Sequence, residues 1–222
     1  MWNRKCGCTS IKHWFHYIHY GNTYEGDIHV WEQKHRQFRA HKRDFNNSPY
    51  YKFIICRNPY ARLVSFFTNH YRYGTAGFEL SLTFAQFIKK LTHTSPQKLD
   101  GHVQPQTYGL DGLKIHRIIK LEELKYELPK VEQYLQIPNA KYFHANASPR
   151  IAWKRHPRPI WRMRSAEFTA GFPPWYNFYN VNLGTQVYQY YEEDFLTFRY
   201  NRFPVPLDPP PWSYPAAELI PP

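Results

Sequence analysis

Cysteine, acidic side chains and long apolar runs are all scarce in this chain of 222 residues. Three cysteines are few, and an odd number, for a secreted scaffold held by disulfides, so they favour a reducing compartment. No stretch approaches the roughly 18 uninterrupted apolar residues of a membrane span, and the start of the chain shows no signal-peptide pattern. We therefore expect a cytoplasmic protein, or a luminal one if the chain is a truncated catalytic domain.

The shortage of acids leaves the chain strongly basic, with 29 Lys and Arg against 17 Asp and Glu. A net charge of +12 favours anionic partners such as nucleotide phosphates, sulfated or uronate-bearing glycans, or nucleic acid. Residues 150–164, RIAWKRHPRPIWRMR, concentrate basic side chains and tryptophans without one acid. Arg155, Arg158 and Arg162 are therefore candidates for binding an anionic substrate, although a solvated basic loop remains the alternative.

The chain also lacks the Walker A pattern G-x-x-x-x-G-K-[ST], which argues against an ATPase, a GTPase or a nucleotide kinase. What it has instead is a series of periodic segments. These predict helices over 10–20 (capped by Thr9 or Ser10), 59–72, 83–91, 122–135 (broken at Pro129) and 185–198, and strands at the chain start and over 50–56 and 116–121. Strand–loop–helix units of this kind predict a parallel α/β sheet flanked by helices, in a single domain over residues 1–202. Residues 203–222 form a proline-rich tail.

The first loop, RKCGCTSIKHWF over residues 4–15, raises the question of a metal site. Cys6 and Cys8 are separated by one residue, whereas cysteine ligands of structural zinc are usually two to four residues apart. His13, His16 and His19 could complete a site, but His13 and His16 also lie where a helix surface would place them. We therefore expect no metal.

A phosphate-binding role accounts for more residues of this loop. Gly7 allows close approach of the backbone to an anion. Thr9 and Ser10 offer hydroxyl and N–H groups where a helix begins, and the helix dipole favours negative charge there. Lys5 and Lys12 add positive charge.

A second loop, FIICRNPYARLVSFF, follows the strand over 50–56. Arg57 stands at the exit of that strand, and Ser65 lies eight residues later on the next helix. The forked donors of arginine suit a phosphate group. Ligands of parallel sheets bind at the carboxyl ends of the strands, so the two loops together indicate a nucleotide phosphate.

These two loops resemble those of the sulfotransferases that use 3′-phosphoadenosine-5′-phosphosulfate (PAPS), and the chain is most similar to the carbohydrate sulfotransferase branch. HVQPQ (102–106), IIKLEELKYEL (118–128), HANAS (144–148) and YYEEDFLTFRY (190–200) are similar to later segments of that branch. The resemblance implies a P-loop-like α/β fold. It assigns the 5′-phosphosulfate to Lys5, Gly7, Cys8, Thr9, Ser10 and Lys12, and the 3′-phosphate to Arg57 and Ser65.

The resemblance further implies sulfuryl transfer to a hydroxyl acceptor, with adenosine 3′,5′-bisphosphate as the leaving product. Lys5 would stabilise the leaving group, and His102, which opens HVQPQ, is the first candidate for the base. His41 is the second. A carbohydrate is the expected acceptor, and a small molecule or natural product is the alternative. The luminal location would then be the Golgi. A basic nucleic-acid-binding module is a competing function that explains the charge but neither loop.

Overall fold

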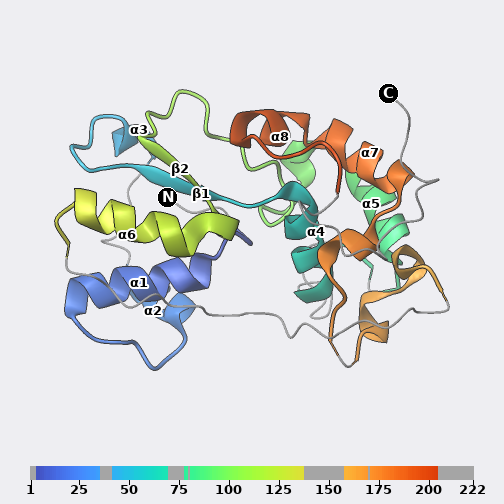
Figure 1. Ribbon diagram of the computed structural model, residues 1–222, viewed down its shortest axis with the longest axis horizontal. Coiled ribbons are helices and arrows are strands. Elements are labelled where there is room, and N and C mark those ends of the chain that lie inside the picture. Colours follow the sequence, from blue (N-terminus) through green and yellow to red (C-terminus); the bar gives the residue numbers. More distant parts are fainter. Residues whose placement is uncertain are drawn as a thin grey trace. The chain divides into compact units, whose positions relative to one another are not determined.

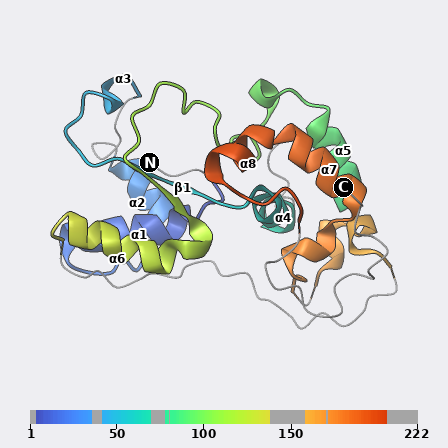
Figure 2. The same cartoon turned by 45° about the horizontal axis from the view of Figure 1, so that its top comes forward.

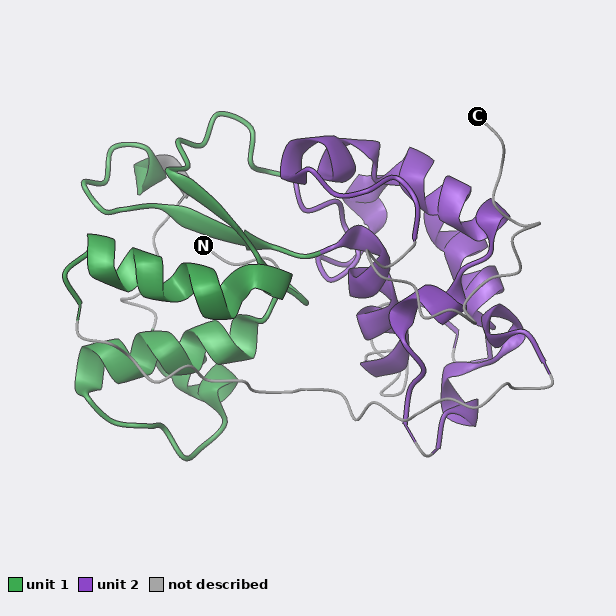
Figure 3. Ribbon diagram, viewed as in Figure 1, with its two compact units in different colours: residues 1–57, 109–147 green, residues 58–108, 148–222 purple. Residues whose placement is uncertain are grey.

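The computed structural model describes residues 4–35, 42–69, 78–79, 81–137, 158–169 and 171–204. The chain divides into two compact units, coloured separately in Figure 3. The first comprises residues 1–57 and 109–147, and the second comprises residues 58–108 and 148–222. The two units differ in secondary structure: the first contains the parallel sheet, and the second is helical.

The first unit is built on a parallel pair of strands, β1 (Phe53–Cys56) and β2 (Arg117–Lys120). Their register pairs Phe53 with Arg117 and Cys56 with Lys120, so both carboxyl ends lie at one edge. The helices of this unit are α1 (Cys8–Tyr20), α2 (Ile28–Lys34), α3 (Lys42–Phe45) and α6 (Leu124–Tyr134). The α/β class with a parallel sheet and flanking helices is confirmed.

Helices α1 and α6 lie side by side in Figures 1 and 2 and share a core with the strands. Ile11 of α1, Ile55 of β1, Ile119 of β2 and Val131 of α6 are buried together. The indole N–H of Trp14 on α1 also donates to a carboxylate oxygen of Glu132 on α6 over 2.6 Å. This core fixes the start of α1 relative to the strand ends.

The second unit packs α4 (Pro59–Asn69), α5 (Phe84–Thr92), α7 (Val181–Tyr190) and α8 (Glu192–Phe198) around an aromatic core. Short 3-10 turns over Pro96–Lys98, Ile160–Arg162, Ser165–Glu167 and Trp175–Phe178 complete it. Tyr60, Phe67, Phe84 and Phe178 are fully enclosed. Much of the aromatic content of the chain therefore serves as core.

Several predicted elements differ in detail. The N-cap of α1 is Gly7 rather than Thr9 or Ser10, because the helix begins earlier than its apolar periodicity suggested. The predicted break at Pro129 is wrong: α6 runs through it, held on either side by buried Leu128 and Val131. The helix predicted over 185–198 is two helices that meet at Tyr191.

Other elements agree closely with prediction. Thr83 caps α5: its hydroxyl accepts the backbone N–H of Gln86, and the Gln86 side chain accepts the backbone N–H of Thr83. Pro59 occupies the first position of α4. The strand predicted at the chain start falls mainly on residues 1–3, outside the described residues, while Arg4 lies in a turn. Most of the proline-rich tail also lies outside them. Across the described segments, no helix is both long and apolar enough to cross a membrane.

Candidate active site

The loop that precedes α1 has an unusual backbone. Lys5 and Gly7 both have positive φ, 65° and 74°, whereas the intervening Cys6 does not. Alternation of backbone handedness turns successive N–H groups toward one side and forms a concave nest that suits an anion. The loop therefore offers an anion site made of backbone alone.

Two observations favour glycine at position 7. Its φ of 74° is strained for any residue with a side chain. In addition, a Cβ there would lie 2.5 Å from Cδ1 of Leu121, which follows β2. The loop thus passes close to the end of the second strand, and a side chain at residue 7 would require the Leu121 side chain to move.

The N-terminus of α1 continues the nest. Gly7 is its N-cap and supplies no side-chain hydrogen bond, and the first turn contains no acidic residue. The first N–H groups of a helix lack partners within the helix, and the dipole there is positive. Cys8, Thr9 and Ser10 form this first turn, so their N–H groups extend the anion site.

Lys5 and Arg57 bring positive charge to the same loop. The Arg57 guanidinium, one residue beyond the end of β1, donates to the backbone carbonyl of Lys5 over 3.1 Å. Burial lowers the pKa of the Lys5 ammonium from 10.5 to about 8, with the Cys8 thiol opposing this shift and the Arg57 charge adding to it. A hydrogen bond thus joins the Arg57 guanidinium, predicted to bind the 3′-phosphate, to the backbone of Lys5, predicted to bind the 5′-phosphosulfate.

Lys12 lies behind this loop and is almost fully buried, with 5% of its surface exposed. Its ammonium forms an ion pair with Glu32 at 2.6 Å and contacts Nδ1 of His29 at 2.7 Å. The other ring nitrogen of His29 contacts the Thr9 hydroxyl at 3.0 Å. No sequence pattern indicated that α2 would supply partners to these residues.

Ser65 and His102 belong to the second unit. Ser65 is partly buried on α4, the helix that starts two residues after Arg57. Nδ1 of His102 forms a short contact with the Asp100 carboxylate, which also accepts the backbone N–H of His102 over 2.8 Å. An imidazole held in this way by a carboxylate resembles the oriented base of other hydrolytic and transfer enzymes. Asp100 was not predicted from the sequence.

Two further residues missed from sequence hold the segment that carries His102. The buried Arg62 guanidinium donates to the carbonyls of Gly101 and Gln104 over 3.2 and 2.7 Å. The fully buried Asp194 on α8 accepts from the backbone N–H groups of Gln106 and Thr107 over 2.8 and 2.9 Å. Their side chains also donate to it. Arg62 on α4 and Asp194 on α8 therefore form a clamp that holds residues 101–107.

Four candidate residues remain from the sequence: His41, Arg155, Arg158 and Arg162. His41 and Arg155 lie outside the described residues. The Arg158 guanidinium is exposed and paired with the Glu167 carboxylate, and Arg162 is exposed at the end of its 3-10 turn. In the described part of the chain no group of three or more His, Cys, Asp and Glu side chains could hold a metal.

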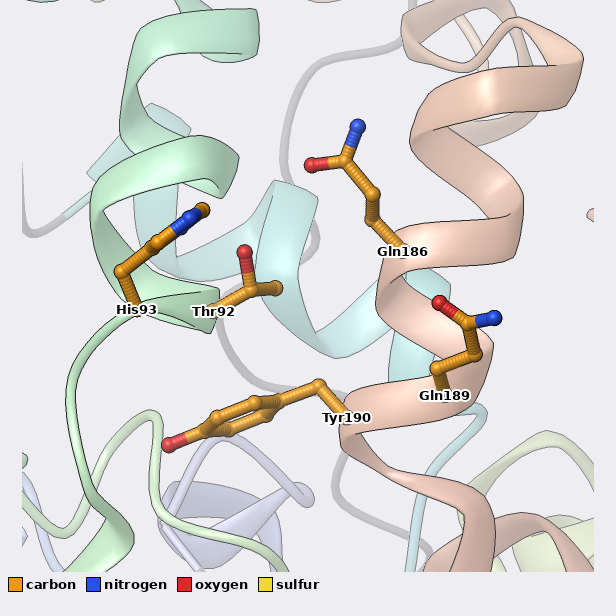
Figure 4. A pocket seen from close by; sticks show the side chains of 5 residues that line it. All are labelled: Thr92, His93, Gln186, Gln189 and Tyr190. Atoms are coloured by element: carbon orange, nitrogen blue, oxygen red, sulfur yellow. The ribbon is translucent and has the colours of Figure 1, made fainter.

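A hollow of about 360 Å³ lies between α5 and α7 (Figure 4). Gln186, Gln189 and Tyr190 of α7 face Thr92 and His93 at the end of α5. None of the site residues predicted from the sequence lines it.

The family of the chain follows from comparison with known proteins. The model of the sulfotransferase family matches residues 4–201, which is most of the chain. The chain belongs to the sulfotransferase family. It is a sulfotransferase enzyme, and dependence on PAPS is the general property of this family. No curated protein and no solved structure is significantly similar to it.

Proposed function

We propose that this sulfotransferase binds PAPS on the loop 4–12 and transfers its sulfuryl group to a hydroxyl of a carbohydrate. The observation that carries the proposal is the backbone nest at Lys5 and Gly7, which runs into the N-terminus of α1, where the N-cap Gly7 makes no side-chain hydrogen bond. These groups fit a phosphosulfate because they offer N–H donors and positive charge and no competing carboxylate from the first turn.

Each residue predicted to bind the cofactor then has a role. Gly7, Cys8, Thr9 and Ser10 hold the 5′-phosphosulfate through N–H and hydroxyl groups, and Lys12 supports them from behind. Arg57 binds the 3′-phosphate, and its bond to the Lys5 carbonyl supports the assignment because it holds the Arg57 side chain against the backbone of the first loop. Ser65 adds a hydroxyl to the 3′-phosphate in the same proposal.

The reaction is an in-line displacement at sulfur. The acceptor oxygen forms a bond to sulfur while the bond from sulfur to the bridging phosphate oxygen breaks, and adenosine 3′,5′-bisphosphate departs. Lys5 neutralises the negative charge that develops on the departing oxygen, a preorganised electrostatic contribution. The displacement asks the protein mainly for positioning and charge.

His102 takes the proton of the acceptor hydroxyl. Its contact with Asp100 supports this role, because a carboxylate at Nδ1 leaves Nε2 to accept the proton and stabilises the imidazolium that forms. His41 is the second candidate. A carbohydrate acceptor rests on the similarity of HVQPQ to the carbohydrate branch, with a small molecule or natural product as the alternative.

An anionic carbohydrate would be bound by Arg155, Arg158 and Arg162. The exposure of Arg158 and Arg162 supports this part of the proposal. We place the catalytic domain at residues 1–202, before the proline-rich tail. The small and odd number of cysteines supports a reducing, cytoplasmic location over the Golgi lumen.

Calorimetric titration with three ligands tests the proposal. Adenosine 3′,5′-bisphosphate should bind one to one, and both ATP and single-stranded DNA should bind at least about tenfold more weakly, a difference of about 1.4 kcal/mol. Tighter binding of ATP would indicate a kinase-like site. Tighter binding of DNA would favour a nucleic-acid-binding module.

A further inference from the structure

A chain of polar contacts connects the phosphate loop to the segment that follows α1. It runs from Glu32 through Lys12 and His29 to the Thr9 hydroxyl, with separations of 2.6, 2.7 and 3.0 Å. Thr9 and Lys12 come from α1, and His29 and Glu32 come from α2, which packs against it. All four residues belong to the first unit.

The chemistry of these contacts fixes the tautomer of His29. The Lys12 ammonium carries only hydrogens to donate, so Nδ1 of His29 must accept. The neutral ring then carries its proton on Nε2, which faces Thr9. The Nε2–H group donates a hydrogen bond to the Thr9 oxygen, so the Thr9 hydroxyl hydrogen must point to a different acceptor.

We propose that His29 is a positioning residue of the phosphosulfate loop, which directs the Thr9 hydroxyl hydrogen toward the 5′-phosphate of the bound nucleotide. The proposal rests on the proposed function for the identity of the anion. Glu32 and the buried Lys12 hold the ring in the tautomer that this requires. This role assigns a function to α2, which lies within residues 21–49, a region without a recognised sequence motif.

The charges around His29 support the neutral ring. Burial lowers the pKa of the imidazole, and the Lys12 charge lowers it further. Asp27 and Glu32 oppose these effects, and His13 adds to them. Asp27 also accepts the backbone N–H of His29 over 2.8 Å, which fixes the start of α2.

The first test compares ligands that differ in the 5′-phosphate. His29→Phe removes both ring contacts and should raise the Kd for adenosine 3′,5′-bisphosphate about 5- to 10-fold, as expected for an impaired hydrogen bond to a charged group. The Kd for adenosine 3′-monophosphate should not change. His29→Gln, which keeps one acceptor and one donor, should retain most of the affinity. His35→Phe, at the other end of α2, is the matched control and should bind as the wild type does.

A double-mutant cycle then separates positioning from general loosening of the loop. In a Thr9→Val background, His29→Phe should change the Kd for the bisphosphate less than about twofold, because the hydroxyl that it positions is gone. An undiminished effect in this background would overturn the proposal. So would an equal loss for the 3′-monophosphate, or no loss at all.

The tautomer itself can be measured on the unmodified protein, which keeps the proposal testable if His29→Phe fails to fold. Nitrogen-15 NMR at neutral pH should show the His29 ring neutral with its proton on Nε2; the missing resonances in His29→Gln identify them. A proton on Nδ1 would refute the inference. If the wild type binds no bisphosphate, the proposed function fails, whereas failure of the cycle or of the tautomer with normal wild-type binding removes only the role of His29.

Discussion

The Lys5 ammonium makes nucleotide binding depend on pH in a specific range. Its pKa lies at about 8 in the ligand-free protein, chiefly because the side chain is buried. A bound phosphosulfate or bisphosphate favours the charged form, so binding must raise this pKa. We therefore expect affinity to fall about twofold between pH 7 and 8 and more steeply above pH 8.

The size of the effect follows from linkage. Between the pKa of the ligand-free protein and that of the complex, each pH unit removes up to tenfold in affinity, or about 1.4 kcal/mol. The Kd for adenosine 3′,5′-bisphosphate should thus rise about five- to sixfold between pH 8 and 9, and by nearly tenfold per pH unit above that. The phosphates of the ligand are already ionised in this range, so Lys5 dominates the change.

Calorimetric titrations at pH 7, 8, 9 and 9.5 measure this dependence. Lys5→Arg is the matched control, since its guanidinium stays charged throughout and its Kd should stay level. Lys5→Met should bind weakly at every pH. A level wild-type profile, or a parallel fall in Lys5→Arg, would refute the assignment of Lys5 to the anion.

The same pKa has the opposite effect on the stability of the ligand-free protein. The folded pKa of Lys5 lies below its unfolded value of 10.5, so the unfolded state binds more protons between pH 8 and 10.5. The free energy of unfolding should therefore rise with pH over this window, relative to Lys5→Met, by up to about 1.4 kcal/mol per unit. Urea denaturation at pH 8 and 9.5 measures it.

Three further predictions concern the loop, the base and the clamp. Gly7→Ala should lower the free energy of unfolding by at least about 1–2 kcal/mol and weaken bisphosphate binding in calorimetry. Gly21→Ala, with the same φ of 74° but open space around it, should cost stability alone, and equal binding losses would contradict the nest. His102→Ala should lower kcat about 100-fold at unchanged bisphosphate affinity, with Asp100→Asn acting in the same direction by a smaller factor; a normal kcat would move the base to His41. Asp194→Ala leaves two buried N–H groups unpaired and should cost about 3 kcal/mol or more in urea denaturation, and a loss below about 1 kcal/mol would contradict the clamp.

The elements that position the phosphate loop could be predicted because their signals are local. The apolar spacing of Ile11, Trp14 and Ile18 marks α1, and the compact run before Arg57 marks β1. The start of α1 was misplaced because Thr9 and Ser10 are good capping residues in isolation. Gly7 is the N-cap instead, with a left-handed backbone and the Leu121 side chain, far along the chain, packed close to it.

The supporting residues could not be predicted because their roles depend on tertiary contacts. His29 and Glu32 stand in a polar, His-rich stretch without a motif, and only the packing of α2 on α1 brings them to Thr9 and Lys12. Asp194 was visible within a family-like segment, but its partners are 87 and 88 residues away. The division into two units is likewise a property of contacts rather than of composition.

Binding of the nucleotide on the loop 4–12 is tested most directly by an NMR titration of nitrogen-15-labelled protein with adenosine 3′,5′-bisphosphate. We expect the largest saturable shifts on the backbone amides of Cys8, Thr9 and Ser10 and on the Arg57 guanidinium. Shifts centred on residues 158–164, or on the hollow between α5 and α7, would contradict it, as would a spectrum that does not change.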